Sequence, residues 1–350
     1  MAEVRQNYNP DYESTGIEGG IDSNQLPWLQ LDGLGNALIK PLRASQENGM
    51  FNMVMKLPAG SPLENVKCLG GLDLLILDGV LEYRGEGATS ELIAGVWGYL
   101  PSGCLIERCV AKVDTELLVN GYGPLALLDE GGQTRGLICS EDIADVASGA
   151  GLDLIPSTLA ECAQPRRVWD GPAESLAIAR QHAGALITEA VSPTVLRHAY
   201  FIDCRSVPWV VNPDLPDVGL KILRVSPETG QVSLLVRHNG VATPHTHIGA
   251  GDFLILQGRL GYRAGPKEGY GPGVWIYEPA GARHDATQRV TDEDLIYTAN
   301  IYGPLVFDSG PGTPVLAVLS WIEYLALAEA GGARLAPNRK VDDHSLFAAG

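Results

Sequence analysis

The stretch His245-Thr246-His247, together with His284, which follows 37 residues after His247, decides the fold. Side chains two residues apart on a β-strand point to the same face. His245 and His247 can therefore lie side by side on one strand, while a distant strand supplies His284. Neutral imidazole suits iron, zinc, copper and nickel, and three ligands leave positions open for a substrate. The sequence thus predicts a metal site with open positions.

An internal repeat is the second informative feature. Four blocks recur in the same order, with offsets between 178 and 181 residues. Residues 22–28 match 203–209, 77–84 match 256–263, 95–101 match 273–279, and 122–125 match 302–305. Because the four blocks recur in the same order, the sequence predicts a duplicated domain.

The two copies differ at the histidines. At the local offsets, His245 corresponds to Val66, His247 to Cys68, and His284 to Ile106. The first copy therefore lacks the predicted ligands, although it keeps the tryptophans, glycines and prolines of the repeat. We interpret the shared residues as scaffold and the histidines as functional.

Composition agrees with two all-β domains. The chain has 350 residues, of which 45% are hydrophobic, with 42 glycines and 23 prolines scattered between short apolar runs. We predict an N-terminal domain at 1–140, a helical connector at 141–195 with a helix over 174–182, a C-terminal domain at 196–330, and a mobile tail at 331–350 that carries His344.

Charge and targeting signals limit the partners. The net charge of -17 argues against binding to nucleic acid, which needs a basic face. The first seven residues show no basic-then-apolar signal pattern, and no apolar run approaches about 18 residues. We therefore expect a cytoplasmic protein without a membrane role, and a homodimer remains open.

Six cysteines without CxxC spacing predict free, mostly buried thiols.

Three strings in the second copy carry a family resemblance. Residues 243–249, 256–262 and 277–284 resemble the cupin branch that contains acetylacetone dioxygenase, 2,4'-dihydroxyacetophenone dioxygenase and the cupin domain of a zinc-binding anti-sigma factor. The resemblance implies two tandem jelly-roll barrels, a bicupin with one metal-binding barrel. Cupins with four ligands usually carry a glutamate seven residues before the glycine that closes the strand, here Gly258, and Gly251 stands there. Asp252 is one residue off and is expected on the opposite face, so its role as a fourth ligand is open.

The resemblance also implies roles for other residues. In the dioxygenases of this branch, three histidines hold Fe(II), which would be His245, His247 and His284 here. Glu278 and Arg263 match the polar groups around the metal, and Phe253 would lie near the substrate.

The repeat separates these candidates. Glu278 becomes Leu100 in the first copy, as expected of a functional residue, whereas Arg263 persists as Arg84. Trp275 and Tyr277, with Tyr297, are predicted to bind substrate or simply to fill the barrel. His238 is a further candidate for the mouth of the barrel.

These residues and the resemblance together imply a non-haem Fe(II) dioxygenase. A small diketone or hydroxyketone would chelate the metal, and O2 would cleave a carbon-carbon bond beside a carbonyl, yielding two carboxylic products. Two alternatives stay open. One is another metal-dependent cupin enzyme, a decarboxylase, isomerase or lyase. The other is a zinc-binding sensor module, and zinc, manganese and nickel are alternatives to iron.

Overall fold

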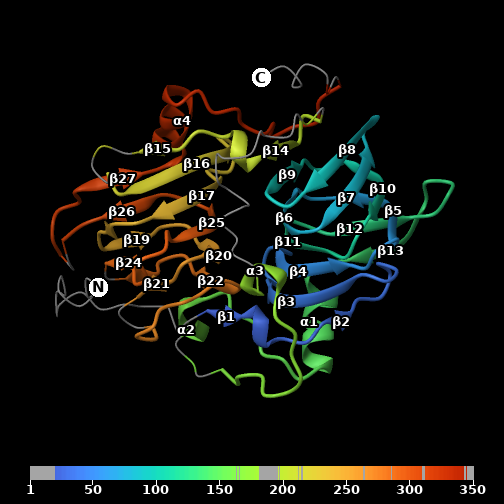
Figure 1. The fold of residues 1–350 in the computed structure, drawn as a ribbon, viewed down its shortest axis with the longest axis horizontal. Coiled ribbons are helices and arrows are strands. Elements are labelled where there is room, and N and C mark those ends of the chain that lie inside the picture. Colours follow the sequence, from blue (N-terminus) through green and yellow to red (C-terminus); the bar gives the residue numbers. More distant parts are fainter. Residues whose placement is uncertain are drawn as a thin grey trace.

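The protein consists of two β-barrels that lie side by side, one formed mainly by the N-terminal half of the chain and the other by the C-terminal half (Figure 1). This computed structural model describes residues 20–162, 164, 166–180, 196, 198–211, 213, 216–262, 265–284, 286–309, 312–342 and 344. Strands dominate, and the four α-helices in the described residues have at most ten residues each. The predicted all-β fold of two tandem barrels with a short helical connector is confirmed.

The N-terminal barrel is built from two antiparallel sheets. Their strand orders are β14-β9-β6-β11-β4-β3-β2 and β13-β12-β5-β10-β7-β8. The strands are β2 (Leu29–Gln30), β3 (Leu38–Ala44), β4 (Phe51–Leu57), β5 (Pro62–Cys68), β6 (Leu72–Asp78), β7 (Val80–Gly85), β8 (Ala88–Ile93), β9 (Val96–Leu100), β10 (Leu105–Ala111), β11 (Thr115–Gly121), β12 (Leu125–Leu128), β13 (Thr134–Ile138) and β14 (Phe201–Asp203).

The C-terminal barrel repeats this plan with one sheet divided. Its strand orders are β1-β22-β20-β25-β17-β16-β15, β23-β19-β26-β27 and β18-β24-β21. The strands are β1 (Ile21–Asp22), β15 (Val210–Val211), β16 (Val218–Val225), β17 (Val232–His238), β18 (Val241–Ala242), β19 (His245–His247), β20 (Gly251–Gln257), β21 (Leu260–Gly261), β22 (Val274–Glu278), β23 (Arg283–His284), β24 (Thr287–Arg289), β25 (Ile296–Ile301), β26 (Leu305–Phe307) and β27 (Ala317–Leu319).

The sheet of the C-terminal barrel that is divided is the one that carries the histidines. In the N-terminal barrel, β5 and β10 each run for seven residues. The corresponding segments of the C-terminal barrel are split into β18 and β19, and into β23 and β24. Pro244 lies in the gap before β19, and proline lacks the N–H that a continuous ladder needs. The histidines therefore sit on short strands in an interrupted wall.

The two barrels exchange a strand. β1, from the first copy, pairs with β22 of the C-terminal barrel, and β14, from the second copy, pairs with β9 of the N-terminal barrel. Between the barrels lies a shared hydrophobic core, to which β20 contributes Leu254 and Leu256. The alternate residues Phe253 and Ile255 face the interior of the C-terminal barrel, as the period of two of a strand requires.

The connector contains α1 (Ser140–Gly149), α2 (Leu159–Cys162) and α3 (Ala177–Arg180). The helix predicted over 174–182 begins only at Ala177, and residues 181–195 lie outside the described part. The prediction of a mobile tail is wrong for His344. This residue is buried, and its ring centroid lies 4.1 Å from that of His198 in the N-terminal barrel.

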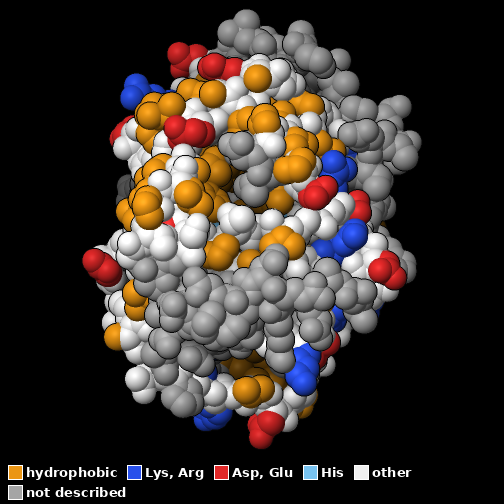
Figure 2. All heavy atoms as spheres, turned by 90° about the vertical axis from the view of Figure 1, so that its left-hand side faces the viewer, with side chains coloured by type: hydrophobic (Ala, Val, Ile, Leu, Met, Phe, Trp, Pro, Cys, Tyr) orange, Lys and Arg blue, Asp and Glu red, His pale blue; other side chains and the backbone are white. Residues whose placement is uncertain are grey.

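α4 (Trp321–Ala330) packs on the C-terminal barrel through Tyr324 and Ala328. Ser320 caps its first turn, because its hydroxyl accepts a hydrogen bond from the amide of Ile322. Figure 2 views the molecule from the side of the C-terminal barrel and shows hydrophobic side chains gathered there. Leu316 and Ile322, just before and within α4, are among the exposed hydrophobic residues. None of the helices in the described residues is long and apolar enough to cross a membrane.

Candidate metal centre

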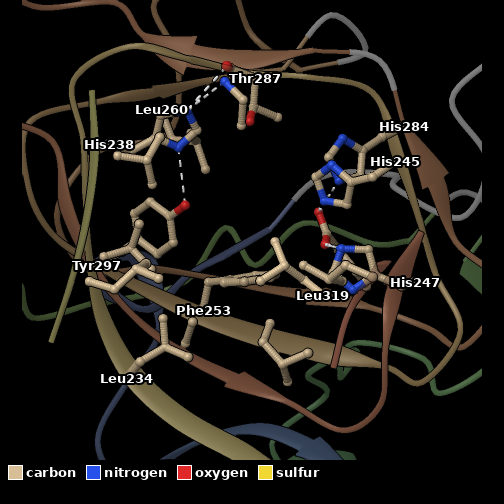
Figure 3. A pocket seen from close by; sticks show the side chains of 18 of the residues that line it. Leu234, His238, His245, His247, Phe253, Leu260, His284, Thr287, Tyr297 and Leu319 are labelled. Atoms are coloured by element: carbon tan, nitrogen blue, oxygen red, sulfur yellow. Dashed lines mark hydrogen bonds and ion pairs between the residues drawn. The ribbon is translucent and has the colours of Figure 1, made fainter. Parts of the chain in front are cut away.

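The structure brings the three predicted histidines together. His245 and His284 are direct cross-strand partners on β19 and β23, and His247 lies on the same face as His245. Their candidate ligand atoms all lie within 4.8 Å of one another, and all three residues are buried. Figure 3 shows the cluster at one end of a cavity.

His245 is held in the form that a metal ligand needs. Its Nδ1 donates to the carbonyl oxygen of Thr243 at 2.9 Å, which leaves Nε2 with a free lone pair. Burial, with help from His284 and His247, holds the pKa of His245 well below its ordinary value. The imidazole is therefore neutral and able to coordinate.

His247 gives an independent test of fit. Within the described residues, neither ring nitrogen of His247 has a hydrogen-bond partner, although both are buried. Nε2 lies 2.5 Å from Oε2 of Glu278, yet that contact lacks hydrogen-bond geometry. Buried polar atoms are rarely left unsatisfied, and each exception needs an explanation. A metal ion held by His245, His247 and His284 would satisfy one of the two nitrogens, since each imidazole offers one ligand atom, so the residues fit such an ion.

Glu278 supplies a carboxylate beside the cluster. Its Oε1 accepts a hydrogen bond from the Tyr262 hydroxyl at 2.7 Å and lies 3.6 Å from Nε2 of His284. Burial alone would raise the pKa of Glu278, but His247 and His284 together hold it well below its usual range. Glu278 is therefore an oriented, ionised carboxylate.

Gly251 explains why the carboxylate comes from β22. Gly251 and Glu278 face each other directly across the β20–β22 pair. A Cβ on Gly251 would lie 3.1 Å from Cε1 of His247, which is tighter than ordinary contact. A side chain at the position that carries glutamate in four-ligand cupins would thus require His247 or Phe253 to shift by a few tenths of an ångström, and Glu278 reaches the same region from the neighbouring strand.

Asp252 does not belong to the cluster. Its carboxylate accepts hydrogen bonds from the Tyr302 hydroxyl and from Nδ2 of Asn300, on the side of β20 that faces the other barrel. The single-residue step from Gly251 turns it away from the histidines. Asp252 is therefore not the fourth ligand.

The cavity next to the histidines has a volume of about 100 Å³ and a largely apolar wall. Phe253 lines it, with its ring centroid 6.2 Å from that of His247, and its contact with a substrate stays a prediction. His238 also lines it. Arg263 lies outside the described residues. The wall is formed by Val218, Leu220, Leu234, Val236, His238, Ala242, His245, His247, Phe253, Leu260, Tyr262, Glu278, His284, Thr287, Tyr297, Ala299, Ile301, Leu305, Phe307, Leu319 and Tyr324.

The prediction that Trp275 and Tyr277 bind substrate is wrong. Both belong to the core between the barrels, and their rings stack with centroids 6.0 Å apart. The guanidinium of Arg43, from the N-terminal barrel, lies 4.1 Å from the centroid of Tyr277. Because side chains alternate along β22, Glu278 faces the cavity and Tyr277 must face the other barrel.

Tyr262 and Thr287 also reach the cavity, and the sequence analysis missed both. Tyr262 persists as Tyr83 in the first copy, so the comparison of the repeats gives no signal for it. Only its contact with Glu278 identifies it as part of the site.

The comparisons with known proteins agree with this fold. The ChrR cupin-like domain matches residues 18–126 and 197–302, and the chain belongs to this family. No curated protein matches the sequence. Among solved structures, acetylacetone dioxygenase from Acinetobacter johnsonii is similar at 20% identity, over 41% of this chain and 97% of that chain, with a TM-score of 0.35. A deletion mutant of oxalate decarboxylase from Bacillus subtilis is similar at 14% identity, over 91% of this chain and 83% of that chain, with a TM-score of 0.48.

Proposed function

We propose that this ChrR cupin-like protein is a dioxygenase that holds one ferrous ion between His245, His247 and His284. Its substrate is a small diketone or hydroxyketone, and the reaction cleaves the carbon-carbon bond beside a carbonyl. One observation carries the proposal: three buried histidines and an ionised carboxylate meet at the end of a small apolar cavity.

Charge favours this class of substrate. Three neutral imidazoles do not reduce the charge of a divalent ion, so an anionic, bidentate enolate would be attracted to it. When bound, Fe(II) would supply the chelation site and the site of O2 activation. The apolar wall favours the hydrocarbon part of a small carbonyl compound.

Glu278 is the group that takes a proton from the substrate. Tyr262 fixes its Oε1, which leaves Oε2 beside the histidine cluster. Removal of a proton from the carbon between two carbonyls, or from an α-hydroxyl group, produces the chelating anion. Glu278 is ionised and can accept that proton at Oε2. Because a low pKa makes a carboxylate a weak base, the substrate must itself be acidic, as a β-diketone is.

The products follow from the atom balance. An α-hydroxyketone and one O2 give two carboxylic acids. A β-diketone and one O2 give one carboxylic acid and one 2-oxoaldehyde. In both cases the two oxygen atoms end in the products, and no other reductant or oxidant is needed.

A zinc-binding module is the second candidate, and the position of Glu278 favours it. The carboxylate lies near His247 and His284, so it could complete a set of four ligands. Such a closed site would bind zinc without turnover.

Metal analysis and oxygen uptake distinguish the two functions. The protein, purified without added metal or chelator, should contain close to one iron per chain. It should then consume one O2 for each diketone or hydroxyketone cleaved. Close to one zinc per chain, with no oxygen uptake after anaerobic loading with Fe(II), would contradict the dioxygenase and support the module.

A further inference from the structure

A second polar group lies in the same cavity, across from the histidines. His238, the last residue of β17, and Tyr297, on β25, both line the wall opposite the cluster (Figure 3). Nδ1 of His238 lies 3.1 Å from the Tyr297 hydroxyl. The Phe253 ring lies near both groups, with its centroid 5.7 Å from that of Tyr297 and 6.2 Å from that of His247.

The duplicated barrel shows that the fold does not need this pair. β17 corresponds to β4 at an offset of 181 residues, and β25 corresponds to β11 at an offset of 180, with the same pairing between them. His238 therefore corresponds to Leu57, and Tyr297 to Leu117. Both leucines are buried in the core of the N-terminal barrel. The pair thus shows the same pattern as the metal-ligand candidates, polar in one barrel and apolar in the other.

Both members of the pair are uncharged. Burial lowers the pKa of His238 to about 4. Burial raises the pKa of Tyr297 far above its ordinary value, and the nearby Glu278 adds to this effect. A neutral imidazole and a protonated phenol recognise an uncharged oxygen better than a charged one, because a buried charge without a partner is costly.

Hydrogen bonding around His238 allows two arrangements. Nε2 lies 3.2 Å from the carbonyl oxygen of Thr287 and 3.2 Å from the amide nitrogen of Ala242. If Nε2 donates to Thr287, Nδ1 accepts from Tyr297, whose oxygen can then accept from a ligand. If Nε2 accepts from Ala242, Nδ1 donates to Tyr297, whose hydroxyl can then donate to a ligand.

We propose that His238 and Tyr297 form a second anchor, which binds the end of the substrate that does not chelate the metal. In this anchor Nε2 of His238 accepts from Ala242 and Nδ1 donates to Tyr297, so the Tyr297 hydroxyl donates to the substrate and His238 is a positioning residue. The substrate is then a small, uncharged compound with a chelating pair of oxygens at one end, an apolar middle that packs on Phe253, and an oxygen at the other end. This inference rests on the proposed function and narrows its substrate class.

Two ligands of equal size test the anchor. Heptane-2,4-dione and 1-methoxypentane-2,4-dione have the same number of non-hydrogen atoms, and one CH2 of the first is an ether oxygen in the second. Their dissociation constants are measured by calorimetry under nitrogen on the full chain loaded with Fe(II). The proteins are the wild type, Tyr297→Phe, and the control Tyr83→Phe, which removes a buried hydroxyl from the other barrel.

Tyr297→Phe should weaken binding of the ether relative to the alkyl compound by about 3- to 10-fold, the usual value of one hydrogen bond. Iron per chain should not change, and Tyr83→Phe should not alter the ratio. His238→Asn, a second variant, should shift the ratio in the same direction. An unchanged ratio in Tyr297→Phe and His238→Asn overturns the anchor alone. Failure of the wild type to bind either diketone overturns the proposed substrate class, and the anchor with it.

Discussion

The two barrels share one frame and differ in what their interiors contain. In the C-terminal barrel, His245 pairs with His284 across β19 and β23, and in the N-terminal barrel Val66 pairs with Ile106 across β5 and β10. The register is therefore identical at the site. In both barrels the interior at this place is buried, but only one interior is polar.

The N-terminal interior is filled where the C-terminal interior is hollow. Phe201 packs edge-on against Tyr83 with ring centroids 4.7 Å apart, and His198 packs against the same tyrosine at 5.2 Å. Tyr262, the counterpart of Tyr83, instead lines the cavity and donates to Glu278. The comparison teaches that one frame holds a packed, mainly apolar interior in one barrel and a cavity with buried polar groups in the other, so the frame itself does not require those polar groups.

The largest difference between the barrels should appear on removal of a histidine. His284→Ala should abolish iron binding and oxygen uptake together, because two ligands at this site do not hold the ion. The matched variant Ile106→Ala, at the same place in the N-terminal barrel, should keep close to one iron per chain. It should lose about 2–5 kcal/mol of unfolding free energy through the cavity it leaves. Iron content and urea unfolding measure the two effects. Retained turnover in His284→Ala would falsify the assignment of the site.

Phe201→Ala tests whether the filled barrel is purely structural. The loss of this buried ring from the N-terminal core should cost about 3–5 kcal/mol of unfolding free energy. Metal affinity should remain as in the wild type, because Phe201 belongs to the core of the barrel that lacks the three metal-ligand candidates. A loss of iron in the folded variant would show that the first barrel acts on the site of the second.

Glu278→Gln should have a smaller effect, confined to the site. The amide keeps the shape and can still accept from Tyr262, but it loses the charge beside His247 and His284. Metal affinity should fall by about 10- to 100-fold, as is usual for groups that orient metal ligands. Deprotonation of the substrate should slow as well. Leu100→Met, the matched change in the N-terminal barrel, should leave both properties unchanged, and titration with Fe(II) under nitrogen measures the difference.

The same comparison explains what could be predicted from the sequence. The repeat predicted a duplicated domain and the spacing of the histidines predicted a metal site, while the resemblance to cupins implied that each copy is a barrel. Trp275 and Tyr277 were misplaced although alternation along β22 places them on the face opposite Glu278, and that the opposite face is buried against a second barrel is a tertiary contact that no local pattern predicts. Tyr262 was missed because the repeat preserves it. The burial of His344 depends on contacts with His198, which lies 146 residues away, and no local pattern predicts such a contact.

The last prediction concerns the interface between the barrels, where the buried Asp73 of one barrel and the buried Asp252 of the other lie. Asp73 accepts a hydrogen bond from the hydroxyl of Tyr122, and Asp252 accepts one from that of Tyr302. Burial raises the pKa of Asp73 to about 6, and burial together with the charge of Asp73 raises the pKa of Asp252 to about 7. In the unfolded chain both have a pKa of about 3.9.

Because both pKa values are higher in the folded state, the folded protein binds more protons than the unfolded chain between about pH 4 and pH 7. These carboxyls therefore contribute stability that is complete below about pH 4 and is lost as the pH rises through 6 and 7. The variants Asp73→Asn and Asp252→Asn remove this dependence of stability on pH. Each pKa unit between the folded and the unfolded state corresponds to on the order of 1 kcal/mol of unfolding free energy. Thermal unfolding from pH 5 to pH 8 should show that the stability of each variant, relative to that of the wild type, increases as the pH rises. Asp252→Asn should gain more, because its pKa is the higher of the two. A constant difference across this range would contradict the raised pKa values, because it would mean that both carboxyls are already ionised at pH 5 in the folded interface.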